Sequence, residues 1–149
     1  MDFSLTPDQR SIGEAIAKLC ERFDARYWLE RDREGGFPED FYRAVAESGW
    51  LGVAMPQEYG GAGLGITEAA LMMQTISQSG AGFSGASAVH MNIFGLNPVV
   101  VFGDAEQKKR WLPPLIRGEL RVAVERAMSI GPRVQLLLQR HRYDYSIAV

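Results

Sequence analysis

The sequence holds few of the residues that mark specialised classes of protein. Cys20 is the one cysteine among 149 residues, so no disulfide can form within the chain, which fits a reducing compartment. Its 16 basic and 18 acidic residues give a net charge of −2, without the basic excess of nucleic-acid binders. No apolar run approaches the roughly 18 residues of a membrane helix, and the N-terminus shows no signal-peptide pattern. We therefore expect a cytoplasmic protein with no nucleic-acid partner and no membrane span.

Strand patterns are also scarce, whereas helix signals recur. Capping residues, prolines and apolar stripes indicate helix starts at Pro7, Pro38, Thr67, Ser84 and Asp104. The first helix is expected to fade near Arg31. The last is expected to reach about Trp111, because Pro113-Pro114 should end it. Up to roughly Arg121 the sequence thus predicts an all-α fold, a helical bundle.

A run of glycines lies in the loop predicted between Leu51 and Gly65. Its order, Gly60-Gly61-Ala62-Gly63-Leu64-Gly65, does not match the dinucleotide fingerprint, and no lysine follows it as in a phosphate-binding loop. We therefore interpret the run as a tight connection between two helices and not as a phosphate cradle.

Other common catalytic and metal-binding patterns are missing. His90, His141 and Cys20 have no spacing of a zinc site, and Gly82-Phe83-Ser84-Gly85 lacks the spacing of a nucleophile elbow. We expect no metal site and identify no catalytic residue. From the residues alone, the interpretation stops at a helical domain.

The order of several sequence segments along the chain carries more information than any single residue. Pro56-Gln57-Glu58-Tyr59-Gly60-Gly61-Ala62-Gly63 is followed by Gly103-Asp104-Ala105-Glu106-Gln107-Lys108-Lys109-Arg110-Trp111-Leu112-Pro113 and then by Gly118-Glu119. Together these segments resemble the N-terminal helical domain of acyl-CoA dehydrogenases, over residues 1 to about 124. Either of the two long motifs alone would be less specific.

The resemblance implies a function. The family desaturates acyl-CoA thioesters: a glutamate removes an α-proton while a β-hydride passes to FAD. In the family, FAD and the glutamate belong mainly to a middle β-domain and a C-terminal bundle, and the N-terminal domain walls the acyl pocket. The resemblance therefore implies acyl-CoA as substrate and FAD as cofactor, with a homo-oligomer or separately supplied domains as partners. We expect the 149 residues alone to be inactive and not to bind FAD.

Candidate site residues also follow from the resemblance. The predicted helix after Gly82 resembles the family helix that lines the acyl chain. On it Ala86, His90 and Phe94 fall on one face, flanked by Ser87 and Met91. These five residues are the predicted substrate-binding residues. The alternative, that the same face packs on a neighbouring helix, stays open.

The C-terminal part departs from the family. After Arg121-Val122-Ala123 the family would continue with a Thr-Glu-Pro segment, which is missing here. We therefore predict a family-like domain over residues 1–124 and an atypical tail over 125–149, produced by truncation or a frameshift near residue 124. The DNA sequence around codon 124 tests whether a frameshift produced the tail. The remaining alternatives for function are a stand-alone helical interaction module and a non-functional truncated product.

Overall fold

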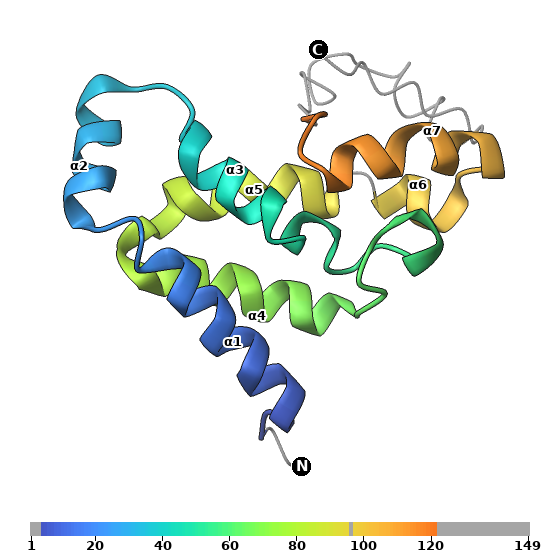
Figure 1. Cartoon of the computed structure of the whole chain (residues 1–149), viewed down its shortest axis with the longest axis horizontal. Helices are drawn as coiled ribbons and strands as arrows, with labels where there is room; N and C mark the ends of the chain where they lie inside the picture. The colour runs from blue at the N-terminus through green and yellow to red at the C-terminus, as the bar shows by residue number, and fades with distance from the viewer. Residues whose placement is uncertain (1–3, 96, 122–149) are drawn as a thin grey trace, which may run out of the picture.

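All regular structure in the computed structural model, which describes residues 4–95 and 97–121, is helical (Figure 1). The all-α prediction is confirmed for these residues, and the predicted tail 125–149 lies outside them. The α-helices are α1 (Pro7–Cys20), α2 (Ala25–Glu34), α3 (Glu39–Glu47), α4 (Ile66–Ile76), α5 (Gly82–Phe94), α6 (Asn97–Phe102) and α7 (Ala105–Ile116). Three short turns join them: η1 (Trp50–Gly52), η2 (Gln57–Tyr59) and the π-helical turn η3 (Ser77–Ala81).

The chain reverses direction at η3, so that α4 and α5 pack against each other. α1 crosses the outer side of α4, and α3 lies on the opposite side, against α5 (Figure 1). α2 contacts the η3 turn, and α6 and α7 form the other end of the molecule with η1 and η2. α5 is therefore flanked by elements from both halves of the sequence.

Local sequence explains the helix starts. The Thr6 hydroxyl accepts a hydrogen bond from the Gln9 N–H, and the Gln9 side chain accepts one from the Thr6 N–H. Asp104 and Gln107 form the same reciprocal cap at α7, as their spacing predicts. Gly49, just after α3, adopts the left-handed backbone conformation with φ 78°, which glycine tolerates without strain.

One predicted helix end and one predicted helix start are wrong. The first helix does not continue to Arg31, because Asp24 adopts extended backbone and its carboxylate caps a second helix by accepting from the Tyr27 N–H. Thr67 does not cap α4. The cap position is Gly65, whose N–H donates to the carboxylate of Glu68 at 2.9 Å.

The proline pair does not end the last helix either. α7 continues through Pro113 and Pro114 to Ile116. A proline inside a helix costs about 3 kcal/mol through a lost hydrogen bond and a clash. Leu112, Leu115 and Ile116 are buried here, and removing such side chains from water offsets a cost of that size.

The buried side chains form two clusters. The larger one joins α1 to α5 and includes an aromatic group, Phe23, Trp28 and Phe41, whose rings pack edge to face. The smaller one holds Met55, Val99, Leu112, Leu115 and Ile116. α5 packs against both, because Phe94 lies on the larger cluster and Met91 on the smaller one.

Within the described residues, one helical run is long and apolar enough to cross a membrane by length and composition, Ile66–Phe102. In the folded chain Gly80 interrupts this run with φ 95°, and the helices on either side of it pack together. Core helices of folded domains pass the same test. The predicted absence of a membrane span stays a prediction.

Candidate functional site

One face of α5 is open to solvent. Ser87 and His90 are exposed, and Phe83, at the start of the helix, has 86% of its surface accessible. Phe94 is half-buried, and its ring centroid lies 5.3 Å from that of His90. These residues follow the spacing i, i+4, i+7 and i+11, which places them along one side of a helix.

The five predicted site residues do not all lie on the open face of α5. Ser87, His90 and Phe94 share the open face of α5. Ala86 is 8% exposed and belongs to the larger core cluster, and Met91 is half-buried against the smaller cluster. The open alternative, in which this face packs on a neighbouring helix, describes Ala86 but not the exposed Ser87 and His90. A substrate-binding role for any of the five stays a prediction.

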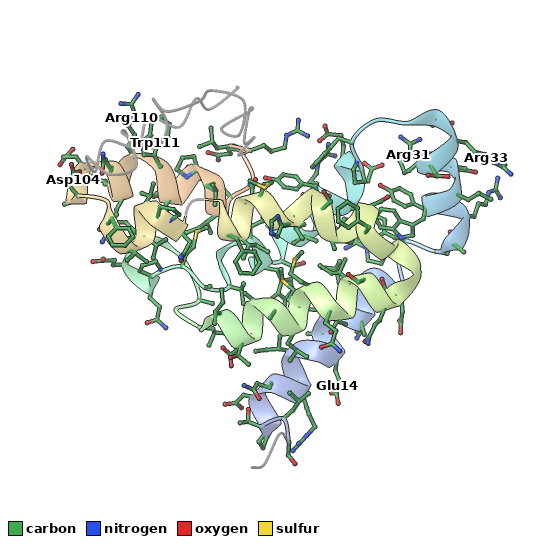
Figure 2. All side chains as sticks on the ribbon, turned by 180° about the vertical axis from the view of Figure 1, so that it is seen from behind. Glu14, Arg31, Arg33, Asp104, Arg110 and Trp111 are labelled. Atoms are coloured by element: carbon green, nitrogen blue, oxygen red, sulfur yellow. The ribbon has the colours of Figure 1, made fainter. Side chains whose placement is uncertain are left out.

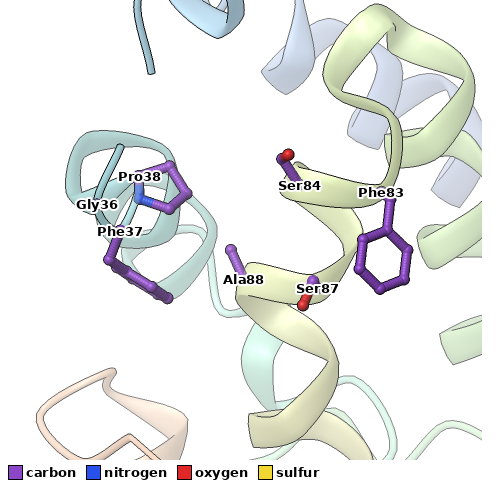
Figure 3. A pocket seen from close by; sticks show the side chains of 7 residues that line it. All are labelled: Gly36, Phe37, Pro38, Phe83, Ser84, Ser87 and Ala88. Atoms are coloured by element: carbon purple, nitrogen blue, oxygen red, sulfur yellow. The ribbon is translucent and has the colours of Figure 1, made fainter. Parts of the chain in front are cut away.

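A groove runs along the upper part of this face (Figure 3). It has a volume of about 380 Å³ and lies between the loop Gly36-Phe37-Pro38 and α5, where Phe83, Ser84, Ser87 and Ala88 line it. Its lining is mainly apolar, with two hydroxyl groups. Such a surface suits an apolar ligand or an apolar protein segment.

The other side of α5 carries a buried polar contact. Asn92 is 2% exposed, and its amide donates to the carbonyl of Leu120 at 2.8 Å and to the hydroxyl of Tyr42. The Tyr42 hydroxyl in turn donates to the same carbonyl at 3.4 Å. Burial raises the pKa of Tyr42 to about 12, so this hydroxyl keeps its proton at neutral pH.

The side chain of Arg121, next to Leu120 in the chain, contacts Glu39 and Phe37. Its guanidinium lies 2.7 Å from the Glu39 carboxylate and sits over the Phe37 ring at 4.4 Å from the centroid. Phe37 lines the groove. The Leu120 carbonyl therefore lies against α5, and the Arg121 guanidinium lies beside the groove residue Phe37.

The glycine-rich loop does not form a phosphate cradle. The backbone N–H groups of residues 60–65 all donate within the protein, for example Gly61 to Pro56 and Gly63 to Met55. A Cβ at Gly61 would lie 2.2 Å from the Met55 carbonyl oxygen, so the chain packs on itself there. This agrees with the predicted tight connection.

Neither the glycine-rich loop nor the groove beside α5 fits the pyrophosphate of FAD. A dinucleotide needs free backbone or cationic donors for its pyrophosphate. The loop donors are occupied, and the groove beside α5 offers two serine hydroxyls without a positive charge among its lining residues. Among residues 4–95 and 97–121, no three histidine, cysteine or acidic side chains are grouped so that they could hold a metal ion.

Sequence reasoning missed three features of this region. Phe83 extends the open face by one turn, and its spacing to Ser87, His90 and Phe94 could have revealed it. Phe37 and Asn92 are distant in sequence from the residues that they meet, so nothing local in the chain predicts their contacts.

The comparisons with known proteins agree with one another. A family model described as the N-terminal domain of acyl-CoA dehydrogenase matches residues 6–119. The mitochondrial isovaleryl-CoA dehydrogenase of Pongo abelii is 33% identical over 117 residues, which are 77% of this chain and 27% of that protein. Acyl-CoA dehydrogenase FadE12 of Mycobacterium tuberculosis is 29% identical over 125 residues, 81% of this chain and 31% of that protein.

A solved structure is also similar. It is described as an electron transferring flavoprotein of Acidaminococcus fermentans, studied for flavin-based electron bifurcation, and one of its chains superposes with a TM-score of 0.73 at 31% identity. The match covers 81% of this chain and 32% of that one. The chain thus spans about a third or less of the proteins that it matches. Because the family model covers well over half of its residues, the chain belongs to the acyl-CoA dehydrogenase family, in the part that forms the N-terminal domain.

Proposed function

We propose that the chain supplies one wall of an acyl-CoA pocket, and that the open face of α5 is that wall. Ser87, His90 and Phe94 contact the acyl part of the substrate in this proposal, and Ala86 and Met91 set the packing behind and beside them. The reaction served is the α,β-desaturation of an acyl-CoA thioester, with FAD as hydride acceptor.

The single observation that carries this proposal is the exposure of α5. The helix is packed on one side through Asn92 and its apolar neighbours, yet the other side presents Phe83, Ser87 and His90 to solvent, beside the half-buried Phe94. Large exposed apolar surfaces mark sites of binding. Membership in the acyl-CoA dehydrogenase family indicates that an acyl-CoA is the ligand to test first.

This proposal assigns neither the catalytic base nor most of the FAD site to the described residues. The N–H groups of the glycine-rich loop are occupied, and no carboxylate lines the groove beside α5. In this proposal the base and most of the FAD site therefore come from residues outside those described. The purified 149-residue chain is accordingly expected to produce no enoyl-CoA. Its location in the cytoplasm and a domain boundary at residue 124 stay predictions.

A photoreactive acyl-CoA tests the pocket wall. An acyl chain that carries a diazirine is irradiated with the purified chain, and the labelled peptides are mapped by mass spectrometry. Labels are expected on residues 83–94 and not on α1, and CoA without the acyl chain should not compete. His90→Ala should alter the labelled positions, whereas Glu14→Ala on the distant helix α1 should not. Labels that are spread over all helices, or absent from α5, would contradict the proposed wall.

A further inference from the structure

One wall of the groove beside α5 does not belong to that helix. The loop Gly36-Phe37-Pro38 forms it, and the aromatic side chain of the loop is Phe37 (Figure 3). The α5 residues that line the groove are small, except for Phe83. The position of the Phe37 ring therefore limits the bulk of a group that can enter the groove.

The backbone that leads into Phe37 is not packed against the rest of the protein. Gly35 and Gly36 have φ values of 73° and 88°, and a Cβ at either position would meet no atom within 4 Å beyond its neighbours in the chain. The Phe37 side chain, in contrast, is half-buried. Its position is therefore set by the side chains that contact its ring.

Two side chains contact the ring of Phe37 in a defined geometry, in addition to its packing on the larger core cluster. The Tyr42 ring meets it edge to face, with the two centroids 5.3 Å apart. The Arg121 guanidinium lies over it, 4.4 Å from the centroid. Tyr42 is 4% exposed and belongs to the core, whereas Arg121 reaches the ring from the surface.

Arg121 is in turn oriented by an ion pair. Its guanidinium lies 2.7 Å from the carboxylate of Glu39, two residues after Phe37. A planar guanidinium can donate to a carboxylate along its edge while its face lies on an aromatic ring. Both charged side chains are half-exposed, so this pair contributes little to the stability of the fold and acts mainly on the ring that it touches.

We propose that Phe37 determines how bulky a group the groove accepts, and that Arg121 is the positioning residue that keeps the Phe37 ring in the groove wall. The inference rests on the proposed function in one point, namely that the group in the groove belongs to an acyl-CoA. Phe37 then acts as a specificity residue, which disfavours aromatic acyl groups relative to straight chains. The positioning of the ring by Arg121 does not depend on the ligand.

The room in the groove can be measured without any acyl-CoA. Ser87→Cys places a thiol in the groove, and Glu14→Cys places a control thiol on the exposed surface of α1 (Figure 2). The unsubstituted chain, whose Cys20 is buried, supplies the background. Each thiol reacts with methyl and with benzyl methanethiosulfonate, and the ratio of the benzyl rate to the methyl rate reports the room for a bulky group.

Arg121→Ala should raise this ratio about two- to fivefold at the thiol in position 87, the size expected when an exposed cation–π contact is lost. The ratio at position 14 should stay the same. Arg117→Ala is the matched control, because Arg117 is also half-exposed and ion-paired, but with Glu119 and not with Glu39. It should leave both ratios unchanged.

A double substitution separates positioning from a general loosening of the fold. Phe37→Ala removes the ring and should raise the ratio at position 87 at least as much as Arg121→Ala does. Adding Arg121→Ala to Phe37→Ala should then change nothing further, because Arg121 acts through the ring. An unchanged ratio in Arg121→Ala would overturn the proposal. So would an equal rise in Arg117→Ala, or an effect of Arg121→Ala that persists without the ring.

A failure of this inference is distinguishable from a failure of the proposed function. Two photoreactive acyl-CoAs are compared, one with the diazirine on a straight alkyl chain and one with it on a phenyl ring. Arg121→Ala should increase the labelling of α5 by the aryl probe relative to the alkyl probe, and an unchanged relative labelling would contradict the role of Phe37 in specificity.

If neither probe labels α5 although the thiol ratio responds to Arg121→Ala, the acyl wall fails and the positioning of Phe37 stands. If both probes label α5 although the thiol ratio does not respond, the acyl wall stands and the positioning of Phe37 fails.

Discussion

Asn92 links three parts of the chain through one amide group. It is the one polar side chain buried in the part of the chain that the structure describes, and it donates both to Tyr42 of α3 and to the carbonyl of Leu120. A buried acceptor that loses its donor costs the full desolvation of that group. This residue therefore couples α5, which carries the candidate site, to the backbone that leaves α7.

Replacing Asn92 with leucine should lower the free energy of unfolding by about 1–3 kcal/mol, because the buried Tyr42 hydroxyl and the part-buried Leu120 carbonyl lose the Asn92 amide as a donor. The matched control is Asn97→Leu at an exposed position, with an expected change below about 0.5 kcal/mol. Urea unfolding of both variants measures the difference. Equal midpoints for the two variants would show that the Asn92 amide contributes nothing.

Position 61 has no room for a side chain, so only glycine fits there. A Cβ there would meet the Met55 carbonyl oxygen at 2.2 Å, whereas a Cβ at Gly13, inside α1, would come no closer than 3.9 Å to a neighbour outside its own helix, Thr75. Gly61→Ala is expected to destabilise the protein by about 1–3 kcal/mol. Gly13→Ala should stabilise it by about 0.5–1 kcal/mol, because alanine favours helix interiors. The two denaturation midpoints should therefore move in opposite directions, and a shift of Gly61→Ala toward higher stability would contradict the packing.

At the scale of the elements, Gln9 and Glu68 connect the starts of α1 and α4. The Gln9 side chain accepts from the Thr6 N–H and donates to the Glu68 carboxylate at 2.9 Å, and the same carboxylate accepts from the Gly65 N–H at 2.9 Å. The bond from Gln9, more than those from the backbone, holds the pKa of Glu68 below its ordinary value.

This lowered pKa predicts a pH dependence. Because the folded pKa lies below the unfolded one, the contribution of Glu68 to stability is present above the unfolded value and is lost as the pH falls through the folded value. At pH 7, Glu68→Gln should cost about 0.5 kcal/mol, a small amount because the pair is near the surface. The cost should shrink when unfolding is measured below pH 4. In a Gln9→Ala background the pH dependence should weaken, and an unchanged dependence there would rule out Gln9 as its cause.

Element boundaries show what sequence patterns can and cannot predict here. The reciprocal caps at Thr6 and Asp104 are local, and both were predicted correctly from their spacing. Asp24 also caps a helix locally, but its signal was hidden by apolar residues that continue the stripe of α1 across it. The continuation of α7 through Pro113 depends on the burial of Leu112 and Leu115, which only the tertiary structure supplies.

The candidate site could likewise be predicted from the sequence only in part. The periodicity of α5 places Ser87, His90 and Phe94 on one face, so this part could be predicted. Ala86 lies at the edge of that face, and whether it is covered depends on neighbours that sequence spacing does not reveal. The loop residue Phe37 reaches the site only because α3 packs against α5.

At the scale of the whole molecule, two apolar clusters meet along α5 and leave one of its faces open. Arg31 and Arg33 of α2 lie at one end of the molecule, and Arg110 and Trp111 of α7 lie at the other (Figure 2). The groove beside α5 is open to solvent. We propose that the chain contributes one side of an acyl-CoA dehydrogenase pocket and holds no flavin by itself.

An absorbance spectrum tests this claim most directly. The purified chain is incubated with excess FAD, free cofactor is removed by gel filtration, and the flavin that stays with the protein is measured per chain. The expected result is a protein spectrum with no visible flavin band, because the backbone donors of the glycine-rich loop are already occupied. A flavin retained at one per chain would contradict the account, since the 149 residues would then build a cofactor site as well as a wall.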